Sequence, residues 1–127
     1  MSDRMNGLLL FAHGARDPAW ALPFEAVARH CAQQRPDRPL SLAYLEFMTP
    51  DLLDAGRSLA AQGCVVVDVV PLFLGTGGHV RKDIPRLLEQ LTERHPQVRW
   101  CLHPTIGESS QVVEAMARVA LSNEGSA

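Results

Sequence analysis

The sequence lacks the features of several broad protein classes. Its apolar runs are far shorter than the roughly 20 residues that cross a bilayer, so no membrane span is expected. The formal net charge is −2, without the basic excess of a general nucleic-acid binder. The first residues do not form the basic, apolar and small-residue pattern of a secretory signal. We therefore expect a cytoplasmic protein that binds neither membranes nor nucleic acid.

Cysteine is also scarce. Cys31, Cys64 and Cys101 are odd in number, widely spaced and set among apolar neighbours. This pattern favours neither a disulfide framework nor a C-x-x-C metal site. We predict that all three are reduced thiols in the protein core.

Apolar runs alternate with helical patterns four times along the 127 residues, a length typical of one domain. This alternation predicts an α/β fold with a four-stranded parallel sheet and helices on both faces. We expect the strand order 2-1-3-4. We expect a single domain over 1–127, with its core at about 7–121 and a flexible tail at 122–127. The predicted strands are 7–12, 40–47, 64–73 and 98–103, and the predicted helices include 18–34 and 109–121.

Local signals predict where the helices begin and end. Asp17 fits the N-cap of the first helix, residues 49–50 open the second, and Asp83 fits the N-cap of the third. Gly63 fits the position just after the second helix. Asp68 interrupts the most valine-rich strand, so it must reach the sheet edge or an interface, or have a partner that the sequence does not name.

Two histidines directly follow predicted strands. His13 comes after the apolar run 8–12, and His79 comes after the run 69–74 and several glycines. In the order 2-1-3-4, a crevice opens between the carboxyl ends of the first and third strands. We therefore expect His13 and His79 to face one pocket, where neutral imidazoles can bind a metal or accept a proton. Glu46 would add a carboxylate from the second strand.

Each of these residues also has an ordinary explanation. Either histidine can be a loop or core residue, and Glu46 can be a solvated carboxylate. The stretch 75–82 resembles a phosphate cradle, but it has neither the G-K-[ST] ending of a P-loop nor G-x-G-x-x-G spacing. A phosphate-binding enzyme is therefore a remote alternative. His103 ends the fourth strand at the same edge, and we expect it to lie too far from the crevice to take part.

Three stretches together resemble a known family: residues 10–17, LFAHGARD; residues 44–47, YLEF; and residues 70–85, VPLFLGTGGHVRKDIP. They are similar to the small sirohydrochlorin chelatases of the short CbiX type, which are class II tetrapyrrole chelatases. The resemblance covers nearly the whole chain and implies a chelatase-like, flavodoxin-like domain of three layers. Ala15 departs from the family, which usually has serine there, and this removes a hydroxyl from the first loop.

The resemblance implies a lyase that inserts a divalent metal, commonly Co²⁺, into sirohydrochlorin during cobalamin biosynthesis. Related enzymes insert Fe²⁺ for siroheme or Ni²⁺ for another cofactor, and a metal or tetrapyrrole carrier without turnover is an alternative. The metal is then a substrate, and no organic cofactor is implied. By residue-to-residue comparison, the metal-binding and catalytic residues of the family fall on His13, His79 and Glu46.

The resemblance also implies contacts with the macrocycle and with a second subunit. Basic side chains would meet the peripheral carboxylates, apolar side chains would contact the ring, and glycines would clear space for it. These residues are Arg16, Phe47, Leu74, Gly77, Gly78, Arg81 and Lys82. Because so small a domain offers only one wall to a large ligand, a homodimer with pockets near the subunit boundary is implied.

Overall fold

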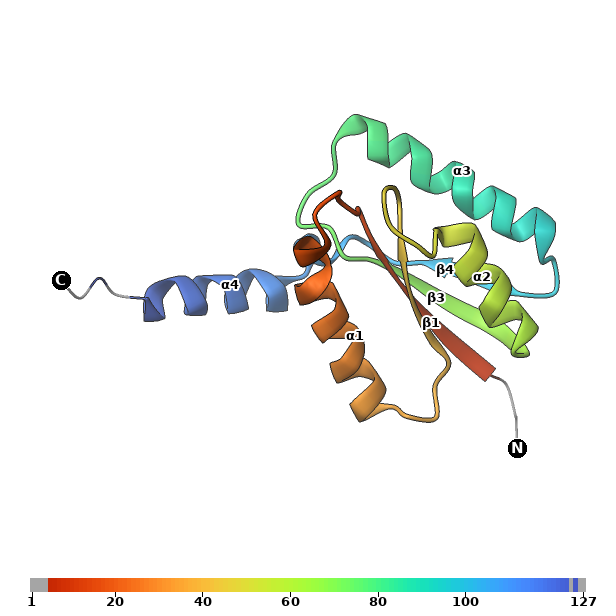
Figure 1. The fold of residues 1–127 in the computed structure, drawn as a ribbon, viewed down its shortest axis with the longest axis horizontal. Helices are drawn as coiled ribbons and strands as arrows, with labels where there is room; N and C mark the ends of the chain where they lie inside the picture. The colour runs from red at the N-terminus through yellow and green to blue at the C-terminus, as the bar shows by residue number, and fades with distance from the viewer. Residues whose placement is uncertain (1–4, 124, 126–127) are drawn as a thin grey trace.

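The computed structural model describes residues 5–123 and 125, without the side chain of His79. Its centre is a parallel four-stranded sheet in the order β2-β1-β3-β4 (Figure 1). The predicted sheet and strand order are therefore confirmed. The strands are β1 (Met5–Ala12), β2 (Leu40–Tyr44), β3 (Cys64–Pro71) and β4 (Arg99–Leu102).

Helical segments follow each strand. They are η1 (Pro18–Ala21), α1 (Leu22–Gln34), α2 (Leu52–Ala61), α3 (Gly78–Arg94), η2 (Ile106–Glu108) and α4 (Ser110–Ser122). Figure 1 shows α2 and α3 on one side of the sheet, α1 on the other, and α4 projecting away from the body. No helix in the described part of the chain is long and apolar enough to cross a membrane.

The main core lies between the sheet and the α2–α3 layer. Because side chains alternate along a strand, β3 sends Val67 and Val69 into this core and Asp68 to the opposite face. A smaller cluster of Ala12, Ala21 and Tyr44 lies near η1 and α1. The fully buried apolar side chains of the main core include Leu9, Phe11, Leu52, Leu59, Val67, Val69 and Leu91.

The first two helices begin later in the chain than the predicted starts at residue 18 and at residues 49–50. Asp17 caps a short 3-10 turn, η1, by accepting a hydrogen bond from the Ala19 amide at 2.9 Å, and the α-helix begins only at Leu22. The second helix was expected to open at 49–50. Instead Asp51 is its N-cap and accepts a hydrogen bond from the Asp54 amide at 2.8 Å.

The predicted ends of the strands and of the third helix also need correction. β2 stops at Tyr44 rather than at residue 47, because the chain then turns: the Met48 amide bonds back to the Glu46 carbonyl at 2.8 Å, and Phe47 has φ +66°. Helix α3 begins at Gly78 with Gly77 as its N-cap, so Asp83 lies inside the helix and does not cap it. The expected position of Gly63 after α2 is confirmed, with φ +95°.

We predicted that all three cysteines lie in the core, and this is right for Cys64 alone. Cys64 is buried, whereas Cys31 and Cys101 are half-buried, and all three are free. Burial raises the pKa of the Cys64 thiol, and the positive charge of Arg38 opposes that rise. The flexible tail predicted at 122–127 lies largely outside the described residues, and the single-domain boundary stays a prediction.

Candidate active site

The first half of the site is built where β1 and β2 end side by side. Ala12 and Tyr44 are register partners, and the chain beyond them stays paired because the Glu46 amide donates to the His13 carbonyl at 3.1 Å. The His13 Nε2 and Glu46 Oε1 atoms lie 3.6 Å apart. The two side chains are 46% and 45% exposed, so the pair is open to a ligand from solvent.

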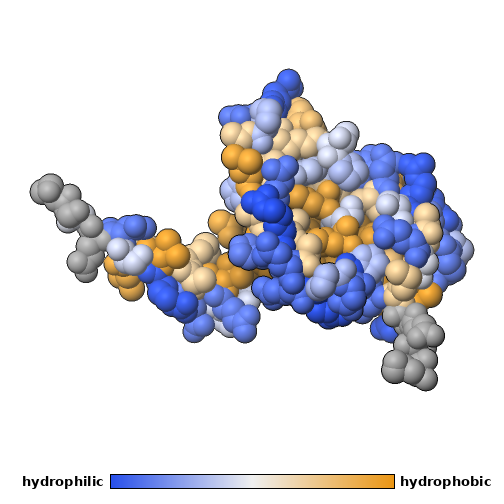
Figure 2. Space-filling model, turned by 60° about the horizontal axis from the view of Figure 1, so that its bottom comes forward, coloured by the Kyte–Doolittle hydropathy of each residue, from blue (hydrophilic) through white to orange (hydrophobic). Residues whose placement is uncertain are grey.

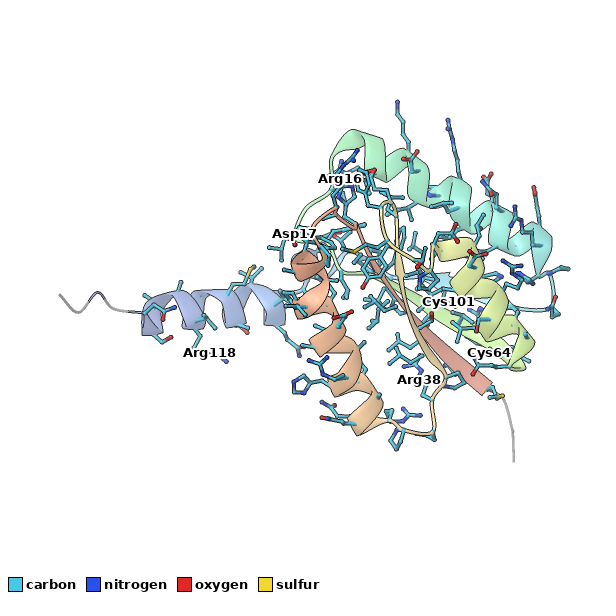
Figure 3. The ribbon with its side chains drawn as sticks, viewed as in Figure 1. Arg16, Asp17, Arg38, Cys64, Cys101 and Arg118 are labelled. Carbon is cyan, nitrogen blue, oxygen red and sulfur yellow. The ribbon has the colours of Figure 1, made fainter. Side chains whose placement is uncertain are left out.

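A glycine makes this close approach possible. Gly14 has φ +93°, and a Cβ placed on it would lie 1.9 Å from the Glu46 carbonyl oxygen. No other residue type fits there without moving the Glu46 loop. The guanidinium of Arg16 lies 4.7 Å from the centre of the Phe47 ring, which ties the same two loops together at the surface. Figure 3 shows Arg16 at this end of the strands.

A cleft of about 390 Å³ opens beside His13. The His13 ring stands edge-on to Phe73, with 6.3 Å between ring centres, and Phe73 in turn packs against the buried Phe11. The lining residues come from η1, from the segment after β3 and from the first turn of α3. They are His13, Trp20, Leu72, Phe73, Leu74, Gly75, Gly77 and Val80.

The glycine-rich segment 75–78 beside this cleft has open space where side chains would lie. A Cβ built on Gly75, Gly77 or Gly78 would meet no atom within 4 Å. Leu74, which precedes them, is 67% exposed. The fold itself therefore does not require glycine at these three positions, and the segment presents an apolar side chain to solvent.

A second cleft of about 470 Å³ lies on the other side of this segment, next to β4. Its lining includes Thr76, Arg81 and His103. Arg81 donates from Nε to the Thr76 hydroxyl at 3.2 Å, so it turns back onto the segment rather than toward His13. Lys82 is exposed at the surface of α3. Of the seven expected tetrapyrrole contacts, Gly77 lines the first cleft, Arg81 lines the second and Leu74 lines both, whereas the other four line neither.

For His79, the expected partner of His13, the structure describes only the backbone. His79 lies in the first turn of α3, and its side chain is outside the described part of the structure. Among the side chains that are described, no three His, Cys, Asp or Glu residues come together as a metal site. The structure thus brings together two of the three expected ligands, His13 and Glu46.

A separate polar cluster surrounds Asp68. Arg38 donates to one carboxylate oxygen of Asp68 at 2.6 Å, and His103 Nε2 lies 2.8 Å from the other. Burial acts to raise the pKa of Asp68, but the hydrogen bond and charge of His103, together with those of Arg38, hold it below its usual range. Figure 3 shows Arg38 at the end of the sheet away from Arg16. His103 is thus engaged with Asp68.

The chain and its fold match a known family. A family model described as CbiX matches residues 7–122. The chain belongs to the CbiX family. A sirohydrochlorin cobaltochelatase of Saccharolobus solfataricus is 38% identical to it over 84 residues, which cover 66% of this chain and 64% of the relative.

Two further relatives of this CbiX chain differ in length. A sirohydrochlorin ferrochelatase of Priestia megaterium is 28% identical over 115 residues, 90% of this chain but 43% of the relative. The crystal structure of a CbiX protein from Marinobacter aquaeolei VT8 superposes with a TM-score of 0.82 and 32% identity, covering 92% of this chain and 95% of that one. The chain therefore spans less than two thirds of both curated relatives.

Some residues of the cleft in this CbiX chain were not singled out from the sequence. Trp20 falls within the predicted helix 18–34 and Phe73 at the end of the predicted strand 64–73, yet both line the cleft beside His13. A signal was available for Phe73, since the end of the third strand lies at the same sheet edge as the two histidines. Trp20 gave no such signal, because its helical spacing is equally that of a core residue.

Proposed function

We propose that this CbiX chain is a sirohydrochlorin chelatase, with Co²⁺ as its first candidate metal. The observation that carries the proposal is the pairing of His13 with Glu46 across 3.6 Å at the mouth of an open cleft. The names of the relatives support the reaction class but differ in the metal, cobalt for the Saccharolobus protein and iron for the Priestia protein. Fe²⁺ and Ni²⁺ are the alternatives.

The spacing of the pair suits two ligands of one ion. Nitrogen and oxygen ligands about 2.1 Å from a tetrahedrally coordinated ion lie about 3.4 Å apart, close to the separation of His13 Nε2 and Glu46 Oε1. Imidazole with one carboxylate suits a borderline metal such as Co²⁺. We propose His79 as the third ligand, by resemblance to the family. Because the ion is a substrate, this small set of ligands must leave positions open for its transfer.

The chemistry requires proton acceptors as well as ligands. When the divalent ion enters the ring, two pyrrole N–H bonds break, two protons leave, and the four nitrogens bind the metal. We propose that Glu46 or one of the histidines accepts these protons. Because Glu46 is half exposed, its carboxylate can pass a proton directly to water.

Residues around the pair have the properties needed to bind a flat anionic ring. Phe47 and Leu74 are 57% and 67% exposed, so they offer apolar surface at the edge of the sheet. We propose that they contact the macrocycle, that Gly77 and Gly78 leave room for it, and that Arg16, Arg81 and Lys82 meet its carboxylates. The proposal includes a homodimer, which would supply a second wall, and a cytoplasmic location.

Substitution of the pair tests the proposal. The purified protein is mixed with sirohydrochlorin and Co²⁺, Fe²⁺ or Ni²⁺, and the absorbance change is followed against a protein-free control. We expect His13→Ala and Glu46→Gln each to lower the rate at least about 100-fold, an effect typical of losing a ligand or a proton acceptor. His30→Ala is the control, since His30 is exposed on α1.

The outcomes separate the candidate functions. A rate that both variants retain would refute the site, and no acceleration with any metal would refute the chelatase. Saturable binding of tetrapyrrole or metal without acceleration would indicate the carrier. The far-ultraviolet circular dichroism of each variant should match that of the unmodified chain, which excludes unfolding as the cause.

A further inference from the structure

Trp20 forms one wall of the cleft beside His13. It belongs to η1, the short turn that Asp17 caps at the start of the first helical region. Its side chain is half-buried and lines the cleft together with His13. The indole is therefore in contact both with the protein interior and with the open cleft.

Aromatic and apolar neighbours fix the indole in place. The centres of the Trp20 and Phe24 rings lie 4.5 Å apart, with 33° between the ring planes. Both side chains pack against the buried cluster that contains Ala12 and Tyr44, the last residues of β1 and β2. The candidate metal ligands follow these strand ends, so Trp20 is held to the same framework as they are. A side chain that is already fixed loses little conformational entropy when a ligand contacts it.

The rest of the cleft wall near Trp20 is aliphatic or bare backbone. Leu74 is 67% exposed, and a Cβ on Gly75 or Gly77 would meet no atom within 4 Å. Phe73 is 8% exposed, so little of its ring reaches the cleft. Among the described residues that line the cleft, Trp20 thus offers the largest flat apolar surface. A planar ligand finds space beside the glycines and a flat partner in the indole.

Apolar surface elsewhere on the protein is of a different kind. Figure 2 shows hydrophobic residues along the projecting helix α4, and the exposed ones, which are not aromatic, are Val113, Met116, Val119 and Leu121. The second of the two tryptophans, Trp100, is also half-buried, but it lies in β4 and lines a separate hollow beside α3. Position, rather than exposure, therefore distinguishes Trp20 from Trp100.

We propose that Trp20 binds the face of the tetrapyrrole ring and holds the ring beside His13 and Glu46. An indole stacks with an offset on a planar conjugated ring, which leaves the carboxylates at the rim of the ring to meet water or arginine. Trp20 carries no charge and binds no metal, so it contributes to binding of the ring alone. The inference rests on the proposed sirohydrochlorin reaction and adds a binding residue to it.

Substitution of the two tryptophans tests this contact. Sirohydrochlorin is titrated with each protein in the absence of metal, and the dissociation constant is read from the absorbance of the ring. Trp20→Leu keeps an apolar side chain but loses the flat surface, and we expect it to raise the dissociation constant about 10-fold. Trp20→Phe keeps an aromatic ring and should stay within about 3-fold of the unmodified chain. Trp100→Phe is the matched control and should have no effect.

Binding of Co²⁺ separates a contact with the ring from a structural role of Trp20. The Trp20→Leu protein should bind Co²⁺ as the unmodified chain does, because His13 and Glu46 are unchanged. A joint loss of Co²⁺ and ring binding would show that Trp20 only shapes the site, which would overturn the proposal. A dissociation constant that Trp20→Leu leaves unchanged, or that Trp100→Phe raises equally, would overturn it as well.

Oxidative footprinting tests the contact in the unmodified chain. Hydroxyl radicals are generated with and without saturating sirohydrochlorin, and mass spectrometry measures the oxidation rate of each tryptophan. The ring should slow the oxidation of Trp20 several-fold and leave that of Trp100 unchanged. A Trp20 that is oxidised equally fast in both states, or not at all in the free chain, would contradict the proposal.

The result can be separated from the fate of the proposed function, because ring binding is measured without metal. If the chain binds sirohydrochlorin through Trp20 but accelerates no metal insertion, the chelatase is refuted and the contact stands. An active chain whose affinity for the ring does not depend on Trp20 reverses the conclusion. A chain that does not bind sirohydrochlorin refutes both.

Discussion

The loop after β1, which carries His13, and the segment after β3, which leads to His79 in α3, are held in opposite ways. The loop after β1 is fixed, because Gly14 lies against the Glu46 backbone and the Glu46 amide bonds the His13 carbonyl. The segment after β3 is open, since nothing lies within 4 Å of a Cβ on Gly75, Gly77 or Gly78. Neighbouring protein atoms fix the conformation of the loop after β1. The glycines of the segment after β3 border space that these atoms do not fill.

This contrast fits two different roles in the proposed reaction, one for each segment. A ligand pair that is fixed before the substrate arrives costs little to organise. A segment with free space around it can accommodate a bulky planar ring without displacing protein atoms. The predictions below test whether the loops differ in this way, in the order of their expected effect on the free energy of unfolding.

The largest effect is expected for Gly14→Ala. The new methyl group would collide with the Glu46 carbonyl oxygen, and the backbone would have to keep φ +93°. We expect the free energy of unfolding in urea to fall by about 2 kcal/mol or more, with loss of any metal insertion. Gly75→Ala is the matched control in the open segment. Equal losses for both variants would contradict the difference between the loops.

A smaller loss is expected when the charge of Asp68 in β3 is removed. Asp68→Asn removes the carboxylate that Arg38 and His103 share, and we expect a loss of about 1–2 kcal/mol in urea unfolding. Asp37→Asn is the control. The pKa of Asp37 is also lowered, by its hydrogen bond with Arg35, but that pair is exposed, and we expect no measurable change.

The same carboxylate predicts a pH dependence. The pKa of Asp68 is lower in the folded chain than its ordinary value of 3.8, so its contribution to stability is complete above that value. As the pH falls through the folded pKa, the contribution is lost. The difference in unfolding free energy between the unmodified chain and Asp68→Asn should therefore shrink on acidification below about pH 4. A difference that stays constant down to pH 2 would show that the charge does not contribute.

The smallest effect on stability is expected for Gly77→Ala. A methyl group there meets no atom of the protein, so the unfolding free energy should change by less than about 0.5 kcal/mol. If the glycine clears space for the macrocycle, the apparent KM for sirohydrochlorin should rise while the fold is unchanged. A stable variant with unaltered kinetics would indicate that the space is not used by the substrate.

Several features could be predicted because they depend on neighbours in the sequence. Four alternations of apolar run and helical pattern predicted the parallel sheet, and Asp17 was correctly assigned as a cap. Asp83 was not, because a side chain that can cap one helix is also tolerated inside another. The second helix was expected to open at 49–50 but is capped by Asp51, since Thr, Pro and Asp all favour the start of a helix.

The sequence by itself determined the alternation and the placing of His13 and His79 after β1 and β3, because hydrophobic periodicity and turn residues act over a few positions. The expected strand order is confirmed by the sheet itself, since several orders are compatible with the same alternation. Only the tertiary structure decided that Asp68 pairs with Arg38 and His103, which lie 30 and 35 residues away in the chain. It also decided that Gly14 meets Glu46 and that α4 leaves the body. These contacts join strands that are neighbours only in the folded sheet, so no local pattern specifies them.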